Sequence, residues 1–103
     1  MKLSALNNFL GLAAKDDRLS VTHIGLFTAL HHLSNDKPPG DFFRISRKVL
    51  MRFSHIRSFV TYHKYIRELN EYGYIIYQPS YDYYKGSQAA LLTCKNLKTI
   101  RNL

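Results

Sequence analysis

The sequence predicts one α+β domain that is mainly helical and carries a small β-hairpin near its end. Its 103 residues are a length that ordinarily forms a single hydrophobic core. Apolar residues recur at helical spacing as far as Gly73, and beyond this glycine the period changes from 3.6 to 2. Hydrophobic residues make up 46% of the chain and charged residues 21%, a balance that excludes disorder.

The first half of the chain predicts two helices. The first lies within residues 1–15 and ends before Asp16, because its apolar residues fall at helical spacing: Leu3, Leu6, Leu10 and Ala13. Ser20 or Thr22 caps the second helix, which ends near Asn35, where SNDKPPGD strings loop formers together. This second helix is apolar over a wide arc, which is typical of a central helix. A short extended segment follows, made of Phe42, Phe43 and Ile45.

Two further helices are expected, joined by a tight turn at residues 54–57. Ser46 caps a helix from Arg47 to Phe53, and Ser58 caps another that runs to Gly73, a natural left-handed end. The buried side of the shorter helix is expected to consist of Val49, Leu50 and Phe53. The inward stripe of the longer helix is expected to be Phe59, Tyr62, Tyr65, Ile66, Leu69 and Tyr72. Its opposite face carries Val60, His63, Lys64, Arg67 and Glu71.

The period of two after Gly73 predicts a β-hairpin. Residues 74–78 form its first strand and residues 89–93 its second, with a loop over residues 79–88 and Gly86 at its tip. Two helices joined by a tight turn and followed by a hairpin define a winged helix-turn-helix, here with an additional N-terminal helix. The whole chain is then one such domain, divided into an N-terminal helix at 1–15, a winged-helix core at 20–94 and a basic tail at 95–103.

The distribution of charge favours a polyanionic partner. Fifteen Lys and Arg residues against seven Asp and Glu residues give a formal net charge of +8. Between Arg44 and Arg67 there are seven cations and no acid, whereas the stretch from Asp16 to Asp41 has four acids and two cations. A solvated surface without a binding role would mix the signs. This one-sided patch therefore points to nucleic acid rather than to another polyanion.

Residues 20–92 carry a resemblance to a known family. The strings ISRKVLMRFSHIRS, TYHKYIRELNEYGYI and YQPSYDYYKGSQAAL resemble small winged-helix proteins encoded on bacterial conjugative transposons and related mobile elements. The resemblance implies DNA binding in the bacterial cytoplasm, associated with the nucleoid. It further implies a role in transcription regulation or in excision and transfer of the element. The aromatic loading of the hairpin and Phe59 depart from the usual winged-helix pattern.

Sequence-specific binding of double-stranded DNA is the function this pattern favours. A recognition helix at 58–72 would enter the major groove, and the wing at 79–88 would reach the neighbouring minor groove or backbone. The candidate contacts are Arg47, Lys48, Arg57, Ser58, Thr61, His63, Lys64, Arg67, Tyr83, Tyr84 and Lys85. The first three lie at helix starts, where phosphates also meet backbone N–H groups. On the same helix, Glu68 is expected to pair with Lys64 four residues earlier.

Several alternatives stay open at this point. Tyr81, Tyr83 and Tyr84 fit either DNA contacts or packing against a second protomer, and the first helix fits either a homodimer contact or a cover for the core. Winged helices also serve as protein docking modules in replication and transfer complexes, which would use the aromatic hairpin. RNA is a weaker third partner, because a braced helix suits the B-form major groove better than A-form RNA.

Other function classes lack the residues they need. The chain has no Gly-rich phosphate loop, nucleophile elbow or HExxH motif, so we expect no enzyme. Its histidines lack zinc-type spacing, and the lone cysteine, Cys94, has no partner nearby, so we expect no metal, cofactor or small-molecule ligand. A single cysteine also fits a reducing cytoplasm. No apolar run approaches the roughly 20 residues that span a bilayer, so no membrane partner is expected.

Overall fold

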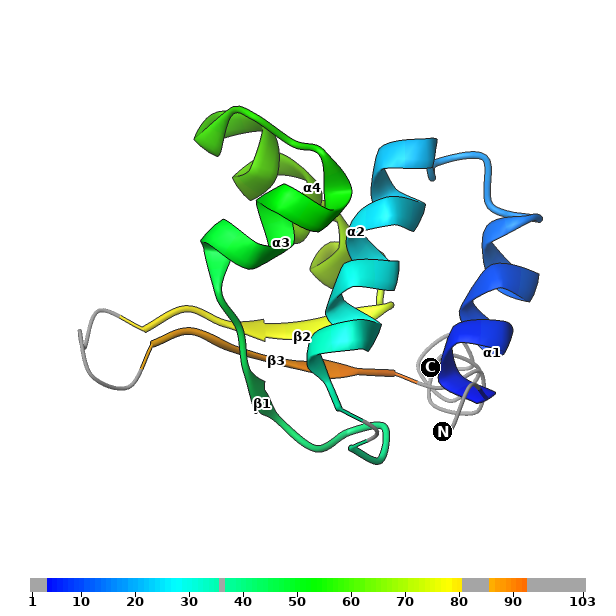
Figure 1. Ribbon diagram of the computed structural model, residues 1–103. Helices are drawn as coiled ribbons and strands as arrows, with labels where there is room; N and C mark the ends of the chain where they lie inside the picture. The colour runs from blue at the N-terminus through cyan, green and yellow to red at the C-terminus, as the bar shows by residue number, and fades with distance from the viewer. Residues whose placement is uncertain (1–3, 36, 81–85, 93–103) are drawn as a thin grey trace.

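The computed structural model describes residues 4–35, 37–80 and 86–92 of the chain. These residues form four helices and a small antiparallel sheet, which confirms the mainly helical α+β class (Figure 1). In chain order the elements are α1 (Ser4–Ala13), α2 (Val21–Leu33), β1 (Phe43–Arg44), α3 (Arg47–Ser54), α4 (Phe59–Glu71), β2 (Ile75–Gln78) and β3 (Gln88–Leu91). No helix among these described residues has both the length and the apolar character needed to cross a membrane.

The sheet has three strands in the order β1-β3-β2, so β3 is central. The hairpin of β2 and β3 was predicted, and its register pairs Ile75 with Leu91 and Tyr77 with Ala89. The pairing of β1 with β3, which places Phe43 opposite Ala89, was not predicted. A strand of two residues shows no alternation of polar and apolar side chains, so the sequence predicts an extended segment there but not its partner.

Serine caps start three of the helices as the sequence predicts. Ser20, Ser46 and Ser58 each accept a hydrogen bond from the backbone N–H three residues later, which satisfies one orphan donor of the first turn. Ser20 rather than Thr22 therefore begins α2. Helix α4 ends with Gly73 at φ +87°, where the N–H groups of Gly73 and Tyr74 donate hydrogen bonds to the carbonyls of Asn70 and Leu69. These two hydrogen bonds form the Schellman motif, which directs the chain into β2.

The core lies where the helices pack against one another and against one face of the sheet (Figure 1). Helix α2 is central, since it contacts α1, α3 and α4, and its Leu26, Phe27 and Leu30 are fully buried. Helix α1 is anchored by Phe9, whose ring stacks on Phe27 with centroids 3.8 Å apart. Leu10, one of the apolar residues that fall at helical spacing in this helix, is 41% exposed. The inward face of α1 therefore passes through Phe9.

Two aromatic residues that the sequence assigned to buried faces are exposed. Phe53 is 49% exposed and Phe59 is 57% exposed. Phe53 lies in the last turn of α3, and its ring makes an edge contact with that of His32 at the surface of α2. Phe59 is on the same side of α4 as Tyr62 but one turn earlier, beyond the edge of the core. Correct helical spacing therefore does not bury a residue where the helix extends past its support.

Candidate nucleic-acid interface

A four-residue turn joins α3 to α4 and sets how the two helices lie. His55 adopts the left-handed conformation at φ 58° and ends α3, and the Ile56 N–H donates to the carbonyl of Met51. The Ile56 side chain is 6% exposed and belongs to the core cluster, so it pins the middle of the turn. Ser58 then caps α4. The turn predicted at residues 54–57 is present one residue later, at 55–58, because Ser54 still belongs to α3.

Helix α4 has one buried side and one fully exposed side. Tyr62, Ile66 and Leu69 are at most 2% exposed, which confirms the centre of the predicted stripe, while Tyr65 and Tyr72 are half-buried. The opposite side is exposed as predicted, and consists of Val60, His63, Lys64, Arg67 and Glu71. Because α4 packs on α2 and β2 through the buried stripe, this exposed side projects from a braced helix.

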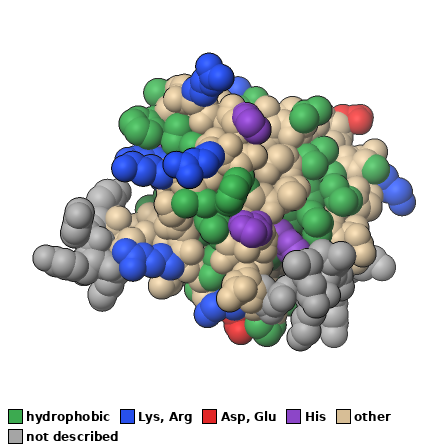
Figure 2. All heavy atoms as spheres, in the orientation of Figure 1, with side chains coloured by type: hydrophobic (Ala, Val, Ile, Leu, Met, Phe, Trp, Pro, Cys, Tyr) green, Lys and Arg blue, Asp and Glu red, His purple; other side chains and the backbone are tan. Residues whose placement is uncertain are grey.

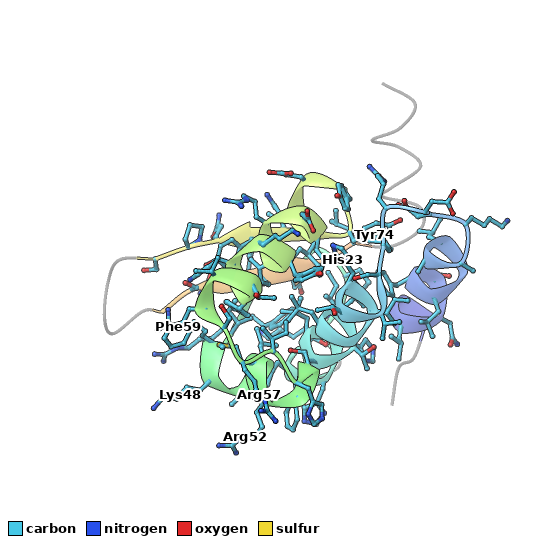
Figure 3. All side chains as sticks on the ribbon, turned by 90° about the horizontal axis from the view of Figure 1, so that it is seen from above. His23, Lys48, Arg52, Arg57, Phe59 and Tyr74 are labelled. Carbon is cyan, nitrogen blue, oxygen red and sulfur yellow. The ribbon has the colours of Figure 1, made fainter. Side chains whose placement is uncertain are left out.

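Exposed cations lie on β1, α3, the turn and α4. We call this surface the basic face; it comprises Arg44, Arg47, Lys48, Arg52, Arg57, Lys64 and Arg67, all of them exposed. Lys48, Arg52 and Arg57 point away from the body of the molecule on one side (Figure 3). In Figure 2, most of the visible Lys and Arg side chains lie toward the left of the molecule, with others at its right and lower edges, and the visible acids lie at the upper right and the lower edge. Among the described residues, no carboxylate forms an ion pair with any member of the basic face.

The sequence prediction for the partner of Glu68 is wrong. It was expected to pair with Lys64, but its Oε1 lies 2.8 Å from Nε2 of His23 on α2. Glu68 is half-buried and directed at α2, whereas Lys64 is exposed and its Nζ lies 5.5 Å from the Tyr65 ring centroid. The acid on α4 thus serves a contact between helices. Lys64 keeps its charge available on the basic face.

The neighbours of His23 determine which of its ring nitrogens accepts a hydrogen bond and which donates one. The backbone N–H of Ser20 donates to Nδ1 of His23 over 2.9 Å, so Nδ1 carries no proton and Nε2–H donates to Glu68. His23 is 3% exposed and its ring lies against Tyr65 and Tyr72. With Ser20 it forms a capping box in which histidine takes the place usually held by Glu or Gln. A histidine three residues after a capping serine was the only sequence signal for this contact.

A second polar cluster fixes the far end of α4. The Tyr74 hydroxyl donates to Oδ2 of Asp16 over 2.5 Å, and Arg18 donates to both carboxylate oxygens of Asp16. The Arg18 guanidinium also lies 4.2 Å from the Tyr72 ring centroid. The hydrogen bonds that Asp16 accepts from Arg18, together with the one from Tyr74, hold the pKa of the Asp16 carboxyl well below its usual range. The loop between α1 and α2 is thereby tied to the end of α4 and the start of β2.

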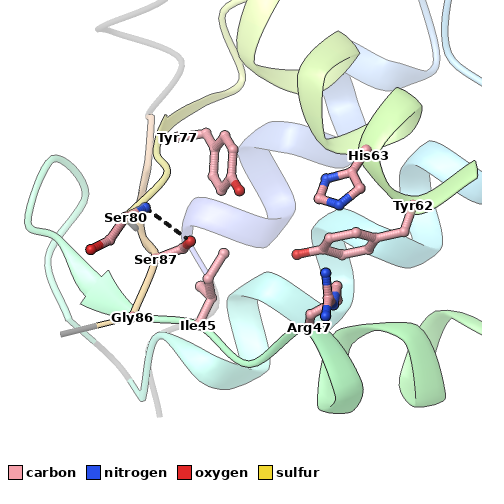
Figure 4. A pocket seen from close by; sticks show the side chains of 8 residues that line it. All are labelled: Ile45, Arg47, Tyr62, His63, Tyr77, Ser80, Gly86 and Ser87. Atoms are coloured by element: carbon pink, nitrogen blue, oxygen red, sulfur yellow. Dashed lines mark hydrogen bonds between the residues drawn. The ribbon is translucent and has the colours of Figure 1, made fainter. Parts of the chain in front are cut away.

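A cleft opens between the start of α3, the middle of α4 and the end of the hairpin next to its loop (Figure 4). It has a volume of about 280 Å³ and is lined by Ile45, Arg47, Tyr62, His63, Tyr77, Ser80, Gly86 and Ser87. The Arg47 guanidinium lies 4.4 Å from the ring centroid of Phe59, which gives that exposed ring a partner. The sequence placed Tyr62 in the core and Tyr77 in a strand. It gave no indication that both would face a cleft beside Arg47.

Eight of the predicted contact residues lie in the described part of the chain. Seven are exposed and Thr61 is half-buried. Those eight are Arg47, Lys48, Arg57, Ser58, Thr61, His63, Lys64 and Arg67. The other three, Tyr83, Tyr84 and Lys85, lie outside the described residues, as do Tyr81 and the segment at 95–103. The helical part of the predicted site is therefore accessible on α3, the turn and α4.

Comparison with known proteins adds no family. No model of a protein family, no curated protein and no solved structure matches the chain. Within residues 4–35, 37–80 and 86–92, no group of three or more His, Cys, Asp or Glu side chains gathers where it could hold a metal ion. The features of the molecule that bear on its function are therefore the surface of α3 and α4 and the cleft beside it.

Proposed function

We propose that this protein binds double-stranded DNA sequence-specifically as a winged helix-turn-helix domain, with α4 as the recognition helix. The observation that carries the proposal is the division of α4 into a buried stripe and an exposed side that bears Lys64 and Arg67. A helix can lie in the major groove only if its opposite side is held by the protein. Glu68 is engaged by His23, and among the described residues no carboxylate, including that of Glu71 on the same side, forms an ion pair with these two cations.

The arrangement around α4 supports the same proposal. Helix α3 and the turn pinned by Ile56 precede α4, and the β2–β3 hairpin follows it as the wing. Strand β1 completes the sheet on the far side of β3. This order of elements is that of a helix-turn-helix followed by a wing. The resemblance of residues 20–92 to winged-helix proteins of bacterial mobile elements points in the same direction.

Each contact residue has a role in this proposal. Arg47, Lys48 and Arg57 bind phosphates, since they lie at or just before helix starts where backbone N–H groups also face an anion. Ser58 and Thr61, in the first turn of α4, approach base edges, and Arg67 is placed to contact a guanine or a phosphate. The wing residues Tyr83, Tyr84 and Lys85 would meet the neighbouring groove or backbone.

The biological setting is part of the proposal. The protein would be a transcription regulator or an accessory factor for excision and transfer of a mobile element in a bacterial cytoplasm. One domain offers few base contacts, and helix-turn-helix proteins commonly reach high specificity as dimers. A homodimer would present two α4 helices to successive major grooves. Helix α1, with Leu10 on its exposed side, is one candidate contact for such a dimer.

Equilibrium binding as a function of salt tests this proposal. The probe is a duplex that contains the DNA flanking the protein's own gene, measured by fluorescence anisotropy from about 50 to 300 mM salt. With about five phosphates contacted, log K is expected to fall with log salt at a slope of roughly −4 to −5. A slope near zero, or no binding to any duplex, would overturn the proposal and favour a protein docking module.

A further inference from the structure

The hydroxyl of Tyr62 lies at the wall of the cleft (Figure 4). Tyr62 is 2% exposed, and its ring packs in the core beside His63. No hydrogen bond among the described residues involves its hydroxyl, which points into the cleft (Figure 4). Burial raises the pKa of Tyr62 well above its usual value, so the hydroxyl stays protonated and is a hydrogen-bond donor. The hydroxyl is therefore free to donate to a ligand bound in the cleft, where solvent reaches it in the free protein.

The groups that share the cleft with Tyr62 favour an anion. The Arg47 guanidinium lies beside the Tyr62 ring, and the hydroxyl of Tyr77 points toward the same space (Figure 4). His63 lines the wall on the side of α4, and none of the described residues that line the cleft carries a carboxylate. Arg47 also belongs to α3 as its first residue, so the backbone N–H groups of that first turn lie nearby. Donors and positive charge therefore converge on one volume.

We propose that this cleft holds one phosphate group, with the Tyr62 hydroxyl and the Arg47 guanidinium as its donors. The source of the phosphate is a strand of the bound duplex, and this assignment rests on the proposed function. The cleft lies between α4 and the hairpin, where the backbone of a duplex that holds α4 in its groove would pass. Tyr62 would thus set the depth at which α4 lies in the groove, because a phosphate contact positions the protein without contacting bases.

Removal of one oxygen tests the assignment. Tyr62→Phe keeps the ring in the core and deletes only the donor, so the melting temperature should hold while affinity for the duplex falls about tenfold, the cost of one charge-assisted hydrogen bond. Tyr65→Phe is the matched control, because Tyr65 lies on the same helix and packs on His23 away from the cleft. The affinity of Tyr65→Phe for the duplex should equal that of the wild type.

A neutral phosphate identifies the partner of Tyr62. A series of duplexes is prepared, each with a single uncharged methylphosphonate at a different position. The affinity of the wild type and of Tyr62→Phe is measured for each duplex. At one position the neutral linkage should lower the affinity of the wild type about tenfold, so that the wild type and Tyr62→Phe bind that duplex equally. If Tyr62→Phe binds the unmodified duplex as tightly as the wild type, the proposal is overturned while the proposed function stands.

A titration with inorganic phosphate distinguishes the two possible sources of the bound group, a strand of the duplex and a free phosphate compound. If the wild type binds no duplex, the proposed function fails, and millimolar inorganic phosphate is titrated while the amide resonances of Ser87 and His63 are followed by NMR. Saturable shifts that Tyr62→Phe abolishes would keep the phosphate site and assign it to a free phosphate compound. No shifts in the wild type would overturn the site as well.

Discussion

The imidazole of His23 and the carboxylate of Glu68 meet at 2.8 Å although they are 45 residues apart in the sequence. This contact joins the first turn of α2 to the third turn of α4. The same histidine accepts the backbone N–H of Ser20, so one buried ring both closes the cap of α2 and holds α4. The orientation of the proposed recognition helix thus depends on a residue far from the basic face.

Loss of this contact should lower stability without touching the basic face. Glu68→Ala leaves the buried Nε2–H of His23 without an acceptor, so the free energy of unfolding should fall by about 1–3 kcal/mol. Lys64→Ala, on the exposed side of the same helix, is the control and should stay within about 0.5 kcal/mol of the wild type. Urea unfolding measures both variants. Equal stability of the two would mean that the pair does not hold α4.

The buried stripe of α4 should be sensitive to a cavity. Leu69 is 0% exposed at the contact of α4 with the core, so Leu69→Ala should lower the free energy of unfolding by roughly 2–5 kcal/mol. Val60→Ala removes atoms from a residue of the same helix that is 80% exposed and should change stability by less than about 0.5 kcal/mol. Thermal unfolding compares the two variants. An unchanged melting temperature for Leu69→Ala would contradict the assignment of the faces.

Acid should weaken the cluster around Asp16. The pKa of this carboxyl is lowered in the folded protein, so its ionised form stabilises the fold above the unfolded pKa of about 4. That contribution is lost progressively as the pH falls from about 5 toward 2, because the unfolded chain takes up a proton first. Asp16→Asn should be less stable than the wild type by about 1–2 kcal/mol at pH 7, and this gap should close toward pH 2. A gap that is constant with pH would exclude the ion pair as its cause.

Two substitutions on α4 separate base contacts from phosphate contacts. Thr61→Ala should change sequence preference with a modest loss of non-specific affinity, since Thr61 lies in the first turn, which approaches base edges most closely. Lys64→Ala should weaken binding to all sequences alike and reduce the salt slope by about one. Competition between the flanking duplex and a scrambled duplex measures both effects. If both variants lose only non-specific affinity, α4 does not contact bases.

Local signals account for what the sequence predicted. Ser20, Ser46 and Ser58 act within three residues of themselves, and Gly73 ends α4 through hydrogen bonds to the preceding turn. Helical spacing likewise identifies Leu69 as buried, because it lies on the same side of α4 as Tyr62 and Ile66. These features depend on neighbours in the chain, so the sequence carries them.

Features that depend on distant contacts were missed. The exposure of Phe59 depends on where the core ends, and the pairing of β1 depends on a strand 45 residues later. Glu68 was assigned to Lys64 because helical spacing offers only neighbours on the same helix. The cleft at Tyr62 forms between three elements, and no single segment predicts it. Tertiary packing decides each of these.

The central claim is that the exposed side of α4 lies in the major groove, and methylation interference tests it most directly. Dimethyl sulfate modifies N7 of guanine in the major groove and N3 of adenine in the minor groove, so one experiment distinguishes the two grooves. The flanking duplex is methylated sparsely, bound by the protein and separated from the free duplex. We predict that methylated guanine N7 is depleted from the bound fraction at consecutive positions of the site. Interference only at adenine N3, or at neither atom, would contradict the account.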